Sequence, residues 1–307
     1  MNSPQINNTE DDLIDLRKLF LAIWNKKIFI SALTSFAAIL SVMYSLSLPN
    51  IYTSTTILAP ATADDSLASK LGNFSSLGAI AGISLPSGTA SKSQEAMERI
   101  KSFDFFSAYI LPNIKLENLM AVKKWVLETN EIIYDEELFD QVNNKWIRDT
   151  PKIIPSNQEA FKVYKNIILV SESKKTSFVN ISIEHKSPVI AKKWVDIILY
   201  QINESMRKID AESANNSISF LKETAQSTNV QSIRETVAKL LENQMQTLML
   251  TSSNDAYVFK TIDSSIVPEE KSKPARALIC IFGTILGGIL SIFIVLIMYF
   301  RSESVNS

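Results

Sequence analysis

Histidine and cysteine, the side chains that most often act as catalytic bases, nucleophiles and metal ligands, occur once each in this sequence. Catalytic triads and zinc sites need these residues in combination with suitable partners, so neither can be assembled from His185 and Cys280. His185 stands at the end of a predicted strand, just before Lys186, and we expect it to have a structural role. Cys280 lies in an apolar run, where we expect it to act as a small hydrophobic residue. The sequence therefore predicts no catalytic residue, no metal site and no disulfide framework.

The acidic residues and glycines also lack the spacing that chemistry requires. Glu269 and Glu270 are followed by Lys271 and Lys273, which indicates a charged cluster beside an apolar segment rather than an acid/base pair. The chain has only 7 glycines and contains neither G-x-x-x-x-G-K-[ST] nor G-x-G-x-x-G, so we expect no nucleotide cofactor. Its 31 basic and 32 acidic residues give a net charge of -1, which argues against a nucleic-acid partner. We therefore do not expect an enzyme.

Two uncharged apolar runs, 28–48 and 277–300, are each long enough to cross a bilayer. A charge at the centre of a bilayer costs roughly 2.5–3.5 kcal/mol, so two such runs indicate transmembrane helices rather than buried core helices. The first run is longer than the apolar part of a signal peptide and follows an acidic leader, so we expect an uncleaved anchor. The preceding segment 13–24 has helical apolar spacing and either lies along the membrane surface or extends the span.

Positive charge sets the expected topology. Arg17, Lys18, Lys26 and Lys27 precede the first span, which places the N-terminus in the cytoplasm and, after two spans, the C-terminus there as well. The predicted segments are a cytoplasmic N-terminal segment (1–27), a first span (28–48), a periplasmic domain (49–276), a second span (277–300) and a cytoplasmic tail (301–307).

The region between the spans has mixed patterns that predict an α+β domain. We expect strands at 51–59 and 257–262, a hairpin at 167–184, helices at 93–110, 155–167, 188–225 and 230–248, and a small helical region around 125–146. Because the outer strands adjoin the spans, we expect a membrane-proximal α/β base. The helix from 188 to 225 would be about 57 Å long, so it should protrude from that base.

Two sets of residues are candidates for contacts between helices or subunits. Gly283 and Gly287, four apart in the second span, either allow close helix packing or reflect the general frequency of glycine in spans. Pro268 and Pro274 precede that span and are expected to set its geometry. The uncharged stretch between Lys70 and Lys92 is either a mobile loop or a segment buried against a neighbouring subunit, and we favour burial. The interface residues predicted in it are Leu77, Ile80, Ile83 and Leu85.

Several of these segments together resemble one family. The runs KKTSFVNISIEHKSPVIAKKWVDIILYQINESMRKID (174–210) and YVFKTIDSSIVPEEKSKPARALI (257–279) are similar to the signatures of the Wzz family of polysaccharide co-polymerases, the O-antigen chain-length determinants. DLRKLFLAIWNKK (15–27) and SLGAIAGISLPSG (76–88) also fit. The chain departs from the pattern at Ser264 and Ser265, where family members often carry proline.

The resemblance implies a function that composition alone does not. Members form ring-like homo-oligomers in the bacterial inner membrane, with bell-shaped periplasmic assemblies and no covalent chemistry. They set the modal length of a surface polysaccharide, such as lipopolysaccharide O-antigen, that a Wzy-type polymerase builds on an undecaprenyl-linked carrier. The resemblance therefore adds coupling to the polymerase as a role for Pro268, Pro274, Gly283 and Gly287. Because no nucleotide motif follows Phe300, the chain resembles the kinase-free class.

The alternative is a two-span membrane sensor or adaptor with a periplasmic domain. That class needs a cytoplasmic output domain, and the segment 301–307 is too short to form one. We therefore expect a scaffold that regulates polysaccharide length.

Overall fold

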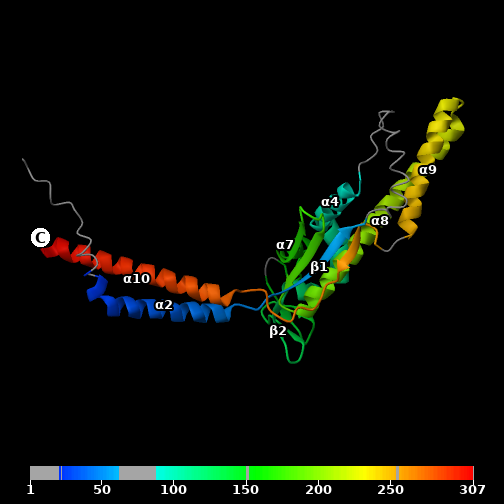
Figure 1. Cartoon of the computed structure of the whole chain (residues 1–307). Helices are drawn as coiled ribbons and strands as arrows, with labels where there is room; N and C mark the ends of the chain where they lie inside the picture. The colour runs from blue at the N-terminus through cyan, green and yellow to red at the C-terminus, as the bar shows by residue number, and fades with distance from the viewer. Residues whose placement is uncertain (1–20, 22, 62–87, 150–151, 254–255, 307) are drawn as a thin grey trace, which may run out of the picture. The chain divides into compact units, whose positions relative to one another are not determined.

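The computed structural model describes residues 21, 23–61, 88–149, 152–253 and 256–306 (Figure 1). The chain divides into two compact units, one made of residues 1–49 and 273–307 and the other of residues 50–272. The smaller, the span unit, contains α2 (Lys27–Ser47) and α10 (Arg276–Asn306). Both helices are long and apolar enough to cross a membrane, with mean hydropathy of 1.8 over Lys27–Ser47 and 2.7 over Arg276–Tyr299. The two predicted spans therefore coincide with helices.

The larger unit is built on a four-stranded antiparallel sheet. Its strands are β1 (Tyr52–Pro60), β6 (Ile168–Glu172), β7 (Val179–His185) and β8 (Phe259–Asp263), in the order β6-β7-β1-β8. The alternation in β7 buries Val179, Ile181 and Ile183 on one face, as a strand with one core face requires. The predicted hairpin and the two outer strands are confirmed, and the first and last strands of the unit are neighbours in one sheet.

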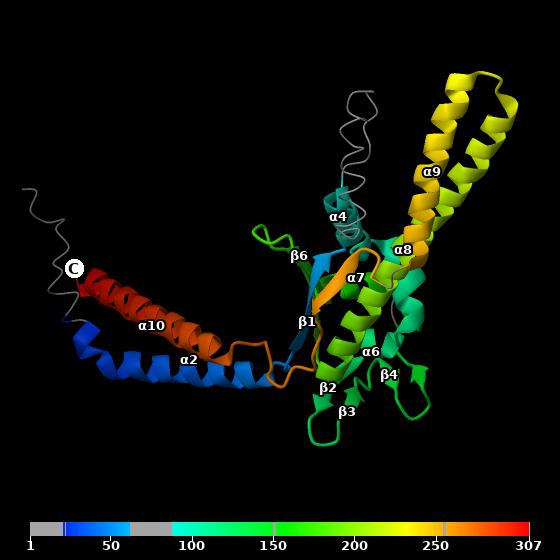
Figure 2. The same ribbon diagram turned by 45° about the vertical axis from the view of Figure 1, so that its right-hand side comes forward.

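A long helix packs on this sheet and then continues beyond it. In α8 (Pro188–Ser227), proline occupies the first turn and the Ser187 side chain accepts the Ile190 N–H, so both favoured N-terminal features are present. Its first half buries Trp194, Ile198 and Ile202 in the core. The chain then turns near Thr228 and returns as α9 (Gln231–Ser253), which packs against the second half of α8. Figure 2 shows this helical hairpin at the end of the unit farthest from strands β2–β4.

Shorter helices complete the core. They are α4 (Gly88–Ile100), α5 (Phe103–Phe105), the π-helical turn η1 (Phe106–Ile110), the 3₁₀ turn η2 (Leu111–Asn113), α6 (Leu116–Met120) and α7 (Asn157–Ile167). The start of α7 is a capping box formed by Ser156 and Glu159, which agrees with the predicted start. The helical prediction over 93–110 is confirmed for 93–100 and 103–110, but a continuous helix there is wrong. Extended backbone at Ser102 ends the first helix, and its side chain accepts the Phe105 N–H to begin another.

The predicted helical region around residues 125–146 is also wrong. The chain there forms two small hairpins, β2 (Val122–Val126) with β3 (Glu131–Tyr134) and β4 (Phe139–Asp140) with β5 (Lys145–Trp146). The turns contain Asn130 and Asn144 at φ values of 55° and 50°. Asparagine tolerates this left-handed conformation better than most residues, so these turns close the hairpins at low cost.

Candidate functional site

The two helices of the span unit pack through small side chains. Ser41 on α2 donates a hydrogen bond to the Ile279 carbonyl on α10 over 2.9 Å, and the Thr34 and Ser291 hydroxyls lie 3.4 Å apart. Ser291 is fully buried, although most of the large apolar side chains of both helices are exposed. This arrangement leaves large side chains for the lipid phase and small ones for the contact between helices.

Two glycines make that close contact sterically feasible. A Cβ atom on Gly287 would lie 2.3 Å from the Cβ of Ala37, and one on Gly283 would lie 2.6 Å from the Cβ of Ser41. A Cβ on Gly288 would meet only Thr34, at an ordinary 3.9 Å. The structure therefore places Gly283 and Gly287 against the other span of the same chain.

The segment between β8 and the second span, residues 264–272, is hydrogen-bonded along β1; we call it the return segment. The Ser54 hydroxyl donates to the Ile266 carbonyl over 2.7 Å, and the Ser272 N–H donates to the Ile51 carbonyl over 2.8 Å. The Thr53 and Ser272 hydroxyls are 2.7 Å apart. Because Ile51 and Ser272 are bonded to each other, the chain leaves the large unit at two adjacent points.

The two predicted prolines lie at different places in this connection. Pro268 is in the return segment, and Pro274 follows the cis peptide bond from Lys273, two residues before α10. Ser265, at the place where the family pattern often has proline, is buried and its hydroxyl donates to Asp196 of α8 over 2.5 Å. The return segment is thus fixed to the long helix as well as to β1. Leu77, Ile80, Ile83 and Leu85 lie outside the described residues.

His185 has the structural role that the sequence predicts. Its Nδ1 accepts the Ser187 N–H over 2.9 Å, so its Nε2 carries the proton and donates to the Asn118 carbonyl, also over 2.9 Å. The ring is buried and contacts Trp194, with 5.0 Å between ring centroids. Burial lowers the pKa of His185 below its ordinary value, and the nearby Lys186 charge lowers it further. The backbone carbonyls of Asn118 and Ser187, 2.9 Å from Nε2 and 3.3 Å from Nδ1, act in the opposite direction because they favour a protonated ring.

Acidification is expected to destabilise the large unit through this histidine. Because the folded-state pKa lies below the unfolded value of about 6.5, the folded protein binds fewer protons and its stability falls as pH drops below about 6.5. Thermal unfolding of tag-free protein between pH 7.5 and pH 5 should show this fall. A His185→Asn variant should be less stable at pH 7.5 but should lose its pH dependence near neutrality. An unchanged pH dependence in that variant would contradict the assignment.

One buried polar residue that sequence reasoning missed is Asn203 on α8. Its Oδ1 accepts the N–H groups of Val258 and Phe259 over 2.8 and 2.9 Å, and its amide donates to the Phe259 carbonyl over 3.2 Å. Strand β8 is at the edge of the sheet, so the outward N–H and C=O groups of its backbone have no neighbouring strand to bond. The Asn203 side chain provides hydrogen-bond partners for those groups at the start of β8. The sequence signal for this buried role was the position of an amide side chain next to Ile202, within the apolar stripe of a predicted helix.

The helical hairpin of α8 and α9 keeps large apolar side chains in solvent. Val237 is buried between the helices, yet other apolar residues on the same pair are exposed. The exposed residues are Phe220, Val230, Ile233, Leu240, Met245 and Met249. Contiguous exposed apolar surface is typical of protein contacts. Among the residues that the structure describes, no group of three or more His, Cys, Asp or Glu side chains could hold a metal ion.

Comparison with known proteins finds two family models and several solved structures that this chain resembles. A family model described as Wzz, chain length determinant protein, matches residues 12–111, and one described as a G-rich domain on putative tyrosine kinase matches residues 222–300. A full-length bacterial polysaccharide co-polymerase is 14% identical over 94% of this chain and 99% of its own, with a TM-score of 0.42. A fragment of WzzB, the co-polymerase from Salmonella Typhimurium, is 14% identical over 73% of this chain and 100% of its own, with a TM-score of 0.34. No significant match is found among curated protein sequences.

The molecule is of a class with two helices able to span a membrane and, between them in the sequence, an α+β unit. The two family models include both of these helices and together match more than half of the chain. Residues 12–111 therefore carry a chain length determinant domain of the Wzz family, and residues 222–300 carry the G-rich domain. The Wzz domain implies a role in regulating the chain length of a polysaccharide.

Proposed function

We propose that this protein is an oligomeric, non-catalytic scaffold of the bacterial inner membrane that sets the modal length of lipopolysaccharide O-antigen made by a Wzy-type polymerase. The observation that carries the proposal is the pair of family matches, one toward each end of the chain, each including an apolar helix and the adjoining part of the large unit. In this proposal both termini are cytoplasmic, and the large unit lies in the periplasm with its sheet near the membrane.

The helical hairpin supports the oligomeric part of the proposal. The exposed side chains of Phe220 and Met249 belong to the same two helices as the buried side chains of Ile218 and Val237, and exposed Val230 lies in the turn between these helices. A second copy of the chain would remove this remaining apolar surface from water, at roughly 25 cal/mol per Å² buried. The undecaprenyl-linked polymer and the polymerase would then contact an assembly rather than a single chain. Coupling to the polymerase through Pro268, Pro274, Gly283 and Gly287 remains part of the proposal.

Deletion of the gene should broaden or shift the O-antigen length distribution without abolishing polymer. The reason is that the polymerase keeps its catalytic groups while the scaffold that regulates it is lost. Lipopolysaccharide from the deletion strain, the parent and a complemented strain can be compared on one gel. Unchanged banding would refute a role in O-antigen length, and loss of all polymer would refute a purely regulatory role.

A further inference from the structure

The two small hairpins of the large unit hold apolar side chains out in solvent. We call residues 122–149 and 152–154 the hairpin lobe. Val142, in the turn between β4 and β5, is 93% exposed, more than any other large hydrophobic side chain in the described part of the chain. Leu127, in the turn between β2 and β3, is 70% exposed, and Ile153 and Ile154 are exposed as well. Such residues at loop tips are costly in water unless something covers them.

Ordered polar contacts fix the backbone that presents these side chains. The Asp140 carboxylate accepts the N–H groups of Val142 and Asn143 over 2.9 and 3.0 Å. The Arg148 guanidinium donates to the Ile153 carbonyl over 3.3 Å and pairs with Glu159 over 2.7 Å. The exposed residues are therefore parts of fixed turns, with their polar groups turned toward the protein.

The lobe also contains three partly exposed aromatic rings, Trp125, Tyr134 and Trp146, and the buried ring of Phe139. Trp125 packs edge-on against Tyr52 with centroids 5.5 Å apart, and Phe139 packs between Tyr134 and Trp146 at 5.3 Å from each. An open concavity of about 600 Å³ adjoins these rings, and its lining is mixed. The apolar and aromatic lining residues are Ile133, Tyr134, Phe139, Val142 and Ile147, and the polar ones are Glu136, Asp140 and Gln141. Tryptophan and tyrosine are enriched where proteins meet the membrane–water interface, because one part of the ring system is apolar and another forms hydrogen bonds.

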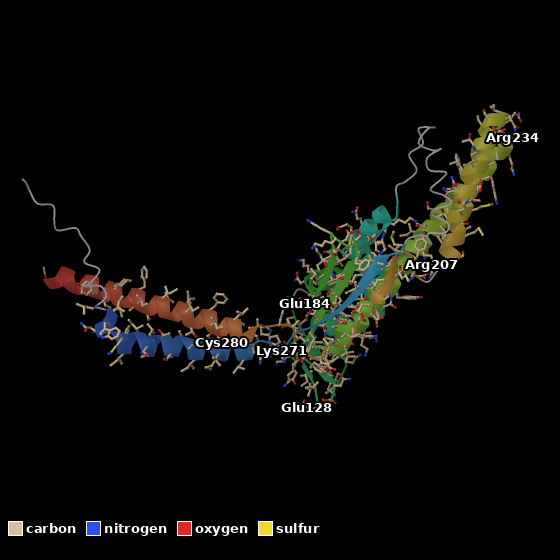
Figure 3. All side chains as sticks on the ribbon, viewed as in Figure 1. Glu128, Glu184, Arg207, Arg234, Lys271 and Cys280 are labelled. Carbon is tan, nitrogen blue, oxygen red and sulfur yellow. The ribbon has the colours of Figure 1, made fainter. Side chains whose placement is uncertain are left out.

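The lobe lies at the end of the large unit from which the chain leaves for the two spans. Tyr52, which contacts Trp125, follows the last residue of α2 by only five positions. Ser272, bonded to Ile51, is the last residue of the unit. Figure 3 shows Glu128 of the lobe and Lys271 at the same end of this unit, with Arg234 of the helical hairpin at the other.

We propose that the hairpin lobe docks on the lipid surface beside the spans, with Val142 and Leu127 inserted among the headgroups and upper acyl chains. The proposal rests on the proposed membrane anchoring of α2 and α10. Lipid is favoured over a second copy as the partner because the exposed residues lie on separate turns. Both turns are at the end of the large unit where the chain connects to the two spans. Acidic residues outnumber basic residues in the lobe by seven to five, so attraction to anionic lipid does not hold it at the membrane and apolar insertion should dominate.

Site-specific fluorescence in vesicles tests this docking. Cys280→Ser removes the only cysteine, and Val142→Cys, Leu127→Cys or Phe220→Cys then places one NBD probe in the full-length protein. Phe220, 67% exposed on the helical hairpin, is the matched control. In phosphatidylethanolamine–phosphatidylglycerol vesicles, lipids spin-labelled near the headgroup should quench the probes at 142 and 127 roughly two-fold, because interfacial side chains lie within about 5–10 Å of the headgroup region. The probe at 220 should be unaffected.

Three results would overturn the proposal in distinguishable ways. Equal quenching at positions 142 and 220 would show that the lobe remains in water. A probe at 142 with blue-shifted emission but no quenching by spin-labelled lipid would show that a protein surface, such as a second copy, covers the lobe. Protein removed from the vesicles by a carbonate wash would refute the membrane anchoring itself, and the docking with it. A native size-exclusion profile for each labelled variant verifies that it is folded.

Discussion

Gly287→Ala is expected to force the two spans apart and to impair length control, whereas Gly288→Ala leaves both unchanged. The new Cβ at position 287 would lie 2.3 Å from the Cβ of Ala37, while carbon atoms pack at about 3.5–4.0 Å, so the helices must separate by about 1 Å or more. The Ala37 side chain has no rotamer that could avoid the contact. At position 288 the nearest atom is 3.9 Å away, so the same chemical change is sterically neutral.

Two measurements check this expectation in complemented deletion strains: the O-antigen length on gels and the oligomer size of the purified protein in detergent. The double variant Gly283→Leu/Gly287→Leu should have the larger effect, because both close contacts are lost and the hydrogen bond from Ser41 to Ile279 is disturbed. Ala37→Gly combined with Gly287→Ala should restore function by removing the clashing methyl group. Wild-type behaviour of the double leucine variant would show that close packing of the spans is not required.

Asn203→Ala is expected to destabilise the large unit by about 2–4 kcal/mol, because it leaves two backbone N–H groups and one carbonyl without their partner. For a unit of this size that loss corresponds to roughly 5–15 °C in the unfolding midpoint. Thermal unfolding of the full-length protein in detergent, followed by tryptophan fluorescence, measures it.

Asn216→Ala provides the matched control for this variant. Asn216 lies on the same helix but is exposed, so its replacement should change stability by no more than about 0.5 kcal/mol. Asn203→Asp keeps the acceptor for the Val258 and Phe259 N–H groups and should fall between the wild type and the alanine variant. Equal midpoints for the two alanine variants would show that the edge of β8 does not need the amide.

Short sequence patterns correctly predicted those helices and strands whose formation depends on neighbouring residues. The hairpin of β6 and β7 was recognisable from alternation on both sides of a polar turn. The start of α7 was recognisable from Pro155 and Ser156, and the start of α8 from Pro188. In each case a short side chain or a fixed backbone angle acts on its own neighbours, so tertiary contacts were not needed for the prediction.

The hairpin lobe shows where local spacing misleads. Apolar residues from Trp125 to Trp146 fit a helical repeat, but Asn130 and Asn144 adopt left-handed backbone conformations that reverse the chain. Asparagine between two apolar runs was the turn signal, and the apolar spacing outweighed it in the prediction. Short strands of two to five residues offer too few alternations to compete with a helical pattern.

Contacts between distant segments could not be predicted at all. Gly287 meets Ala37 across almost the whole chain, and Ser265 meets Asp196 only because the return segment runs beside α8. Spacing singled out Gly283 and Gly287 as a packing motif but could not tell which helix they would face. That choice depends on the register of two helices, which no single segment determines.

The hydrogen bonds between Ile51 and Ser272 bring the two ends of the large unit together, so the whole unit could be exchanged between related proteins. Both covalent connections of residues 50–272 to the rest of the chain begin at neighbouring backbone positions. Domains with adjacent termini are tolerated as insertions, because the host needs to accommodate only one narrow junction. Recombination between relatives at these two points would therefore combine one protein's apolar helices with another's large unit while each retains its own core.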